Sequence, residues 1–193
     1  MAYANLEEAI AAGAREIVAS SDAPGWAWKT WPDALWTLTA LESLALVQGA
    51  LYELPAEIAG LTNLRSLVIR GSIQRAAAGG LGRLSSLRSL AWDAPEILPP
   101  DVRDLRLDRL SIIGSWGHVL PEITTIPVRV NVTLLGDEQA ADRLGFENLS
   151  AWRELQELEL DAYPDFDTRT FERSLPRCGF AINRTGNRAR DRA

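Results

Sequence analysis

The sequence is poor in the side chains that bind metals and form disulfides. It has one cysteine, Cys178, and one histidine, His118, among its 193 residues. A single cysteine excludes an intrachain disulfide framework, and one residue of each kind leaves too few ligands for an ordinary structural zinc site. We therefore expect neither a bound metal nor a small fold held together by disulfides.

Excess basic charge and long apolar runs are missing as well. The formal net charge is -6 and the isoelectric point is about 4.9, whereas a general nucleic-acid binder normally presents a basic surface. No stretch approaches the roughly 18 apolar residues of a membrane span, and acidic residues precede the first apolar run, which is the wrong order for a secretory signal. We expect a soluble, cytoplasmic protein without nucleic-acid or membrane partners, although an acidic inhibitor of a basic target fits this composition.

The most informative feature of the sequence is an internal repeat. The segment WPDALWTLTALESLAL, from Trp31, realigns with LPAEIAGLTNLRSLVI, from Leu54, after a shift of 23 residues. A second shift of 23 residues reaches a further set of matched apolar positions, Leu81, Leu84, Leu87, Leu90 and Trp92. A fixed period of this length is typical of repeat proteins, in which each unit buries its apolar side against its neighbours.

The core of the repeat reads L-x-x-L-x-L, which resembles the leucine-rich-repeat family. The Leu-Pro-x-x-Ile-x-x-Leu lead-in is similar to the typical class of that family. The resemblance implies an α/β solenoid with a curved parallel sheet on its concave side and short helical, 3-10 or irregular segments on its convex side. Five copies are clear, at Leu41/Leu44/Leu46, Leu64/Leu67/Ile69, Leu87/Leu90/Trp92, Leu107/Leu110/Ile112 and Leu155/Leu158/Leu160, and two are degenerate, at Ala14/Ile17/Ala19 and Pro127/Val130/Val132.

The chain also departs from the family pattern. Where the full motif continues to an asparagine that hydrogen-bonds adjacent turns, this chain has Gly49, Ser72, Pro95 and Ser115. We expect irregular turns on that edge and uneven curvature. The spacing widens before Leu158, and we expect a helical insertion at about residues 137–148, begun by an acidic first turn near Asp137.

The terminal repeats need caps because they would otherwise expose leucine. We predict one domain over residues 1–183, with repeats over about 14–161. Residues 1–13 form an amphipathic capping helix, with Leu6, Ala9, Ile10 and Gly13 on its apolar face. Residues 162–183 close the other end, where CGFAINR offers a final strand and the expected anchors are Phe171, Leu175, Phe180 and Ile182. The polar residues 184–193 should be disordered.

Catalysis leaves no signature in the sequence. There is no nucleophile beside a base, and no pair of carboxylates in a recognisable motif. His118 and Cys178 are interpreted as an ordinary loop histidine and a half-buried thiol. The glycine-rich AAAGGLG lacks the lysine and serine or threonine of a phosphate loop and falls where the repeat requires a convex connection. We expect a non-enzymatic protein with no cofactor.

Seven tryptophans raise the question of a stacking surface. Trp31, Trp92 and Trp152 occupy apolar positions of the repeat and are expected in the core. Trp26, Trp28 and Trp36 lie off the frame, where they either pack over the cap or stay partly exposed. Trp116, between Ser115 and Gly117, is expected to be exposed, and exposed aromatic residues are frequent binding hot spots.

In the leucine-rich-repeat family, strand residues facing away from the leucines line the concave binding surface. Here the early ones are small and partly apolar, and the later ones are charged. Charged side chains on such a face are also expected without any partner. The alternative is a polar stripe formed by Arg70, Arg109 and Arg129, with an acidic pole formed by Glu157, Glu159 and Asp161, near Asp165 and Asp167. The candidate partner-binding residues are Arg70, Asp93, Arg109, Trp116, Arg129, Asn131, Glu157, Glu159 and Asp161.

The leading hypothesis is a protein-protein interaction module that binds a partner on the concave face. The alternative is an acidic immunity protein or inhibitor that occludes a bacterial toxin or enzyme, with the acidic pole against a positively charged site. An enzyme that carries repeats as a substrate reader is disfavoured, because repeats and caps use nearly all of the chain.

Overall fold

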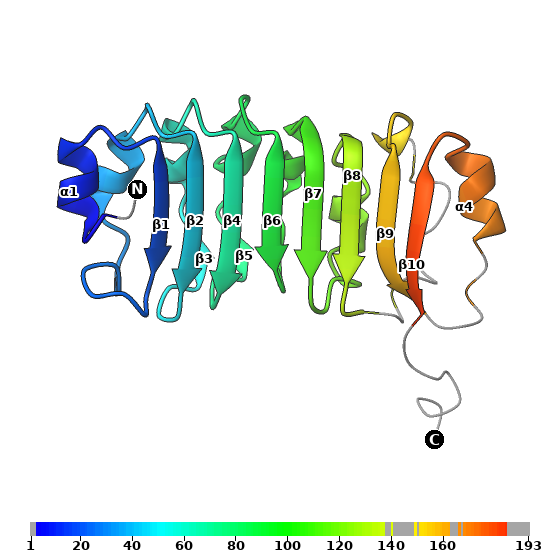
Figure 1. Ribbon diagram of the computed structural model, residues 1–193, viewed down its shortest axis with the longest axis horizontal. Helices are drawn as coiled ribbons and strands as arrows, with labels where there is room; N and C mark the ends of the chain where they lie inside the picture. The colour runs from blue at the N-terminus through cyan, green and yellow to red at the C-terminus, as the bar shows by residue number, and fades with distance from the viewer. Residues whose placement is uncertain are drawn as a thin grey trace, which may run out of the picture.

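The computed structural model describes residues 3–137, 140, 149, 151–162, 166 and 168–184. Its main element is an eight-stranded sheet with the order β1-β2-β4-β6-β7-β8-β9-β10, in which every neighbouring pair is parallel (Figure 1). The expected α/β solenoid arrangement is confirmed. The strands of this sheet are β1 (Glu16–Ser20), β2 (Ser43–Gln48), β4 (Ser66–Gly71), β6 (Ser89–Asp93), β7 (Leu107–Ile113), β8 (Val128–Leu135), β9 (Glu157–Ala162) and β10 (Gly179–Arg184).

The register of the sheet follows the sequence period. Ser43 lies opposite Ser66, and Ser66 lies opposite Ser89, so each of these steps spans the 23 residues found in the sequence. Alternate residues point to opposite faces of a strand, so the repeat leucines stack in rows on one face. Those rows are fully or almost fully buried, at Leu44, Leu46, Leu67, Ile69, Leu90, Trp92, Leu110, Ile112, Leu158 and Leu160.

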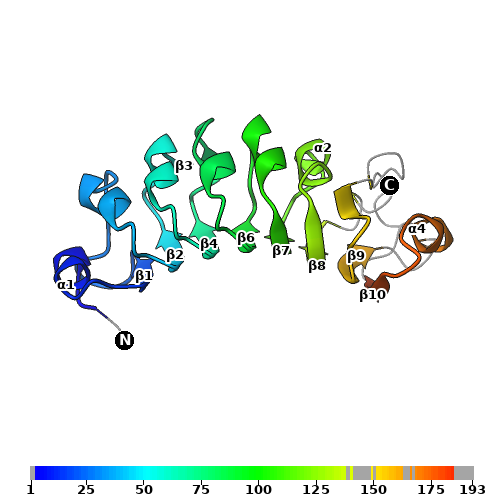
Figure 2. The same ribbon diagram turned by 90° about the horizontal axis from the view of Figure 1, so that it is seen from above.

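Short segments return the chain along the buried face of the sheet. They include four 3-10 turns, two two-residue strands and a helical turn. Figure 2 shows the short helical segments on the outside of the curve with the sheet on the inside. Pro32, Pro55 and Pro99 precede three of the 3-10 turns, where a proline costs no ladder hydrogen bond. The segments are η1 (Asp33–Thr37), η2 (Ala56–Gly60), η3 (Leu81–Arg83), η4 (Pro100–Asp104), β3 (Glu53–Leu54), β5 (Arg75–Ala76) and α2 (Leu120–Ile123).

Strand β8 has a different register from the one the sequence predicted. Leu110 lies opposite Val132, and Ile112 lies opposite Leu134, so the prediction that Val130 and Val132 fill those two positions is wrong by two residues. An irregularity lies between the pairs Leu107↔Val128 and Arg109↔Asn131. The pair Leu107↔Val128 is already displaced by one residue from the predicted pairing of Leu107 with Pro127, and the irregularity adds a second residue to β8. Val132 is therefore buried, and Val130 is only half-buried.

Other groups tie the turns where the asparagine ladder is missing. The buried Gln48 donates from Nε2 to the carbonyl oxygens of Ala19, at 2.9 Å, and Trp26, at 3.0 Å. The hydroxyl of Ser72 donates to the carbonyl of Gly49, at 3.0 Å. Gly71 has a φ of 89°, and a Cβ at this position would collide with the backbone of Gln48. Each turn on this edge is therefore held by a different set of contacts, in keeping with the irregular turns that the sequence predicted.

A short helix caps the amino-terminal end of the solenoid. Helix α1 (Leu6–Ala11) begins at Asn5, whose side chain accepts a hydrogen bond from the Glu8 amide at 2.9 Å. Glu8 in turn accepts from the Ala4 amide, so the two side chains form a reciprocal capping pair. Leu6 and Ala9 are buried as expected, but Ile10 is 37% exposed. The helix has under two turns, so its apolar stripe is narrower than predicted.

Helix α4 (Arg169–Ser174) lies beside β10 at the other end (Figure 1). Leu175 is buried, as expected of an anchor. Phe180 and Ile182 are only partly buried, because β10 is the last described strand of the sheet. Arg184 ends β10, so the predicted tail begins at least one residue too early. The side chain of Phe171, residues 185–193 and most of the predicted helical insertion lie outside the described residues.

The tryptophans are mainly structural. Trp92 and Trp152 are fully buried, as predicted, whereas Trp31 is half-buried. Trp26 and Trp36 are buried. The four rings form a continuous row in the order Trp26, Trp28, Trp31 and Trp36, with successive ring centroids 5.7, 6.1 and 5.3 Å apart. This row packs the segment between β1 and η1 onto the end of the solenoid.

Candidate interaction surface

The solvent-facing side of the large sheet is the main candidate surface, and we call it the open face. The short helical segments described between the strands lie on the opposite side of the sheet, while α1 and α4 lie at its two ends (Figure 2). The ends of the sheet bend away from those segments, so the open face is the concave side. This curvature presents side chains from all eight strands toward a common volume.

Small side chains fill most of two rows on the amino-terminal half of the open face. One row consists of aligned serines, Ser43, Ser66 and Ser89. The next row is apolar, and its first member, Val18, is 68% exposed. The aligned residues of that row are Val18, Ala45, Val68 and Ala91. Because these side chains are short, a partner can approach the backbone of the sheet closely there.

Charged side chains concentrate on the other half. Along the serine row, Ser89 is followed by Arg109, Asn131 and Glu157. Glu159 and Asp161 follow Glu157 at alternate positions of β9, so the three predicted carboxylates lie on one strand and point to the open face. We call Glu157, Glu159 and Asp161 the acidic pole.

Neighbouring groups hold the acidic pole in place. The Asp161 Oδ2 accepts from the Gly136 amide at 2.8 Å, and the Glu159 Oε1 accepts from the Asn183 side chain at 3.3 Å. A depression of about 280 Å³ lies beside them, lined by Asn131, Glu157, Leu158, Glu159, Gly179, Phe180 and Ala181. Gly179 lies opposite Glu157 and has no side chain to fill this space. The depression combines negative charge with room for a long side chain.

The three arginines of the predicted polar stripe do not come together. Arg70 lies on β4 and pairs with Asp93, with Nε and Oδ2 3.6 Å apart. Burial raises the pKa of the Asp93 carboxyl above its usual value, and the nearby Arg70 guanidinium opposes that shift. Arg109 lies in a different row of the sheet, beside Ser89 and Asn131.

Arg129 is displaced from the open face. It lies within the irregularity of β8, and both its Nε and Nη2 donate to the Asp108 Oδ1, at 3.2 and 2.9 Å. This pair lies at the edge of the sheet where the strands begin. The prediction of a stripe that includes Arg129 is therefore wrong, for the same reason that the register of β8 was misjudged.

Trp116 is not exposed. Its side chain is fully buried, and the indole nitrogen has no hydrogen-bond partner. Trp116 follows Ile112 by four residues, as the buried Ile73 follows Ile69. The tryptophan therefore replaces a core residue of the turn after the strand. Its glycine and serine neighbours suggested a surface loop, but this repeat offset indicates the core.

His118 lies in the loop after β7, and Cys178 lies directly before β10. His118 is exposed in a loop, and burial together with the charge of Glu157 raises the pKa of the Cys178 thiol to about 11. Within the described ranges, no group of three His, Cys, Asp or Glu side chains could hold a metal ion. The glycine-rich segment forms the connection into η3, as expected. None of the described helices has the length and apolar content that a membrane crossing requires.

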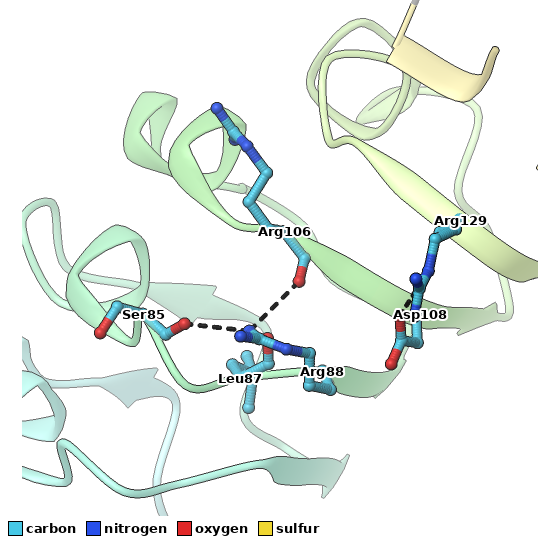
Figure 3. Close-up of polar contacts among 6 residues, drawn as sticks. All are labelled: Ser85, Leu87, Arg88, Arg106, Asp108 and Arg129. Carbon is cyan, nitrogen blue, oxygen red and sulfur yellow. Dashed lines mark hydrogen bonds and ion pairs between the residues drawn. The ribbon is translucent and has the colours of Figure 1, made fainter. Parts of the chain in front are cut away.

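A groove rich in arginine was missed by the sequence reasoning. It lies where strands β6 to β9 begin, has a volume of about 540 Å³, and we call it the edge groove. The sequence held one signal for it, because Arg65 and Arg88 each directly precede a serine of the 23-residue repeat, Ser66 and Ser89. Figure 3 shows Arg88 between Ser85 and Arg106, with Arg129 over Asp108. The lining residues are Arg88, Arg106, Leu107, Asp108, Pro127, Val128, Arg129, Ala151, Arg153 and Glu154.

Sequence comparison with known proteins does not assign this chain to a family. No protein-family model matches the chain, and no curated protein matches it in sequence.

Proposed function

We propose that this protein is a non-enzymatic interaction module of the leucine-rich-repeat type, which binds a protein partner on its open face. The 23-residue period, the parallel sheet and the short segments on its convex side support the family assignment. The observation that carries the functional proposal is the concave sheet face, which the short segments between its strands leave uncovered over the described residues.

The size of the open face limits how the partner can bind. Eight strands at a spacing of about 4.8 Å and a length of about 16 Å present an area of roughly 550 Å². A stable interface usually takes about 800 Å² from each partner. We therefore expect the partner to contact the turns at the rim as well as the strands.

The two halves of the open face have different roles in this proposal. The row of Val18, Ala45, Val68 and Ala91 supplies apolar surface, whose burial favours binding by roughly 25 cal/mol per Å² before the cost of association. The acidic pole supplies charge that steers a complementary surface and sets its orientation. The partner thus has an apolar patch beside a basic one.

A second candidate function is an inhibitor or immunity protein that occludes a basic site of a bacterial toxin or enzyme. The depression of about 280 Å³ beside Glu157 and Glu159 favours it, because a lysine or arginine side chain could insert there. Binding of this kind would place the two carboxylates within ion-pair distance of the inserted cation. This candidate differs from a general module in needing one tight partner.

The experiment uses the immobilised chain to capture binding proteins from a lysate of the source organism, and then measures the affinity of the captured protein. We expect the double substitution Glu157→Gln/Glu159→Gln to weaken binding at low ionic strength and to have less effect at high salt. The matched control, Glu57→Gln/Glu96→Gln, removes the same charge from exposed positions outside the open face. Equal affinity of both variants at low salt would remove the acidic pole from the proposal.

A further inference from the structure

Two of the guanidinium groups that line the edge groove, those of Arg88 and Arg106, are fixed by hydrogen bonds to backbone carbonyls. Arg88 Nη1 donates to the carbonyls of Ser85, at 2.9 Å, and Leu87, at 2.7 Å. Arg106 Nη1 donates to the carbonyls of Arg103, at 3.1 Å, and Leu105, at 2.8 Å. The Nε and Nη2 groups of both arginines have no acceptor among the described residues. Their backbone contacts fix the side chains, so binding would cost little further conformational entropy.

Charge in the edge groove is not balanced internally. Asp108 is paired with Arg129, at 2.9 Å. Arg153 is exposed and has no hydrogen-bond or ion-pair partner in the described part of the chain. The lining of the groove therefore holds three arginines without a carboxylate partner, Arg88, Arg106 and Arg153, and one carboxylate, Glu154, that has no partner of its own among those residues. An excess of positive charge has collected in one hollow of a protein whose net charge is -6.

We propose that the edge groove binds an acidic peptide segment of a partner protein through aspartate or glutamate side chains. A guanidinium presents parallel N–H groups that match a carboxylate. The groove volume of about 540 Å³ lies in the range of specific ligand sites and accommodates a short segment. Leu107, Val128 and Ala151 in its lining provide apolar surface for a neighbouring side chain.

The same observations favour a short acidic peptide over a nucleic acid. Asp108 and Glu154 lie among the arginines, and Glu157 follows Glu154 by three residues at the start of β9. A long phosphate backbone would leave the groove and meet these carboxylates and the acidic pole. The groove is at the edge of the sheet, so this inference stands whether or not the open face binds a partner.

The test measures fluorescence anisotropy of a fluorescein-labelled hexaglutamate peptide, with a hexaglutamine peptide and a hexathymidylate of similar length as comparisons. We expect hexaglutamate to bind at low ionic strength and hexaglutamine not to bind. Arg153→Gln should weaken binding by about threefold, and Arg88→Gln/Arg153→Gln by about tenfold, from the loss of charge-assisted contacts. The matched control is Arg83→Gln, an exposed arginine on η3 outside the groove.

Arg153 is exposed and makes no hydrogen bond or ion pair with the described residues, so Arg153→Gln should fold normally. This single variant therefore still tests the proposal if the double variant does not fold. The proposal is overturned if hexaglutamate does not bind, if Arg153→Gln leaves its affinity unchanged, or if Arg83→Gln weakens it equally. Tighter binding of hexathymidylate than of hexaglutamate would also overturn it, in favour of a phosphate-binding groove.

Discussion

Adjacent residues of one strand experience opposite environments. Leu67 is fully buried beneath the sheet, while the next residue, Val68, lies on the open face and is half-buried. Successive side chains of a strand point to opposite faces of the sheet, and stacking of the repeats excludes water from one of those faces. A substitution at one residue therefore tests the core, and the same substitution at its neighbour tests the surface.

We predict that Leu67→Ala destabilises the protein by about 2 to 5 kcal/mol, because a buried large-to-small change loses apolar contacts and leaves a cavity. Urea unfolding followed by circular dichroism measures this change. Val68→Ala is the matched control on the same strand and should cost far less. Similar losses for both variants would mean that the assignment of the two faces is wrong.

Cys178 provides a second prediction at the residue scale. Burial and the negative charge of Glu157 raise the pKa of its thiol to about 11, so only about one thiol in a thousand is ionised at pH 8. Alkylation by iodoacetamide should be slow in the native state and should accelerate as pH approaches 11. Glu157→Gln should lower the thiol pKa and speed the reaction at pH 8. Unchanged rates would show that Glu157 does not act on the thiol.

Single residues are also where sequence reasoning failed most clearly. Trp116 was expected on the surface because serine and glycine flank it, yet it fills a core position of the repeat. Flanking residues describe local chain flexibility, whereas burial depends on the repeat frame. The frame predicted Leu44, Leu67 and Leu90 correctly because those positions combine apolar character with the regular period.

At the scale of the element, strand β8 shows how one irregularity propagates. The sequence offers valines at both 130 and 132, so hydrophobic pattern alone does not choose between two registers. A one-residue offset at the pair Leu107↔Val128, together with the backbone irregularity that follows it, places Val132 in the core. Arg129 lies within this irregularity, near the start of β8, and lines the edge groove.

This register is testable by paired substitutions in β8. Val132→Ala should cost about 2 kcal/mol, because Val132 is fully buried. Val130→Ala should cost clearly less, since Val130 is only half-buried. Denaturant titrations of the two variants give the comparison. A larger loss for Val130→Ala would support the register first predicted from the sequence.

The segment after β1 depends on a single side chain. Gln48 donates two buried hydrogen bonds, to Ala19 and Trp26, in place of the missing asparagine ladder. Its Oε1 is buried without a partner, which offsets part of that benefit. Gln48→Ala should therefore cost about 1 to 3 kcal/mol and should increase amide hydrogen exchange mainly in residues 20–31.

Gln74→Ala is the matched control, because the Gln74 side chain makes no hydrogen bond within the described residues and is half-buried. Its exchange pattern should resemble that of the unsubstituted protein. If amide hydrogen exchange in Gln48→Ala increased equally over the whole protein, and not mainly near Trp26, the proposal that Gln48 holds this segment in place would be contradicted.

At the scale of the whole molecule, the three surface features occupy different places. The apolar row lies on the amino-terminal half of the open face, the acidic pole lies on β9, and the edge groove lies where β6 to β9 begin. The period and alternation of the sequence were sufficient to predict the sheet and the acidic pole. The edge groove was not predicted: the arginines that precede the repeat serines hinted at it, but its shape joins residues from four turns whose relative positions depend on irregular spacings.

The central claim is that the open face binds the partner, and a direct test is the affinity of the captured protein for two charge-introducing variants. Val68→Arg places a long charged side chain in the middle of the open face, whereas Glu57→Arg makes a comparable change at an exposed position on the convex side. Calorimetric titration should show at least about a tenfold loss of affinity for Val68→Arg, through steric and desolvation costs, and little loss for Glu57→Arg. Full affinity of a folded Val68→Arg variant, with binding lost in Glu57→Arg, would place the partner on the convex side and contradict the proposal.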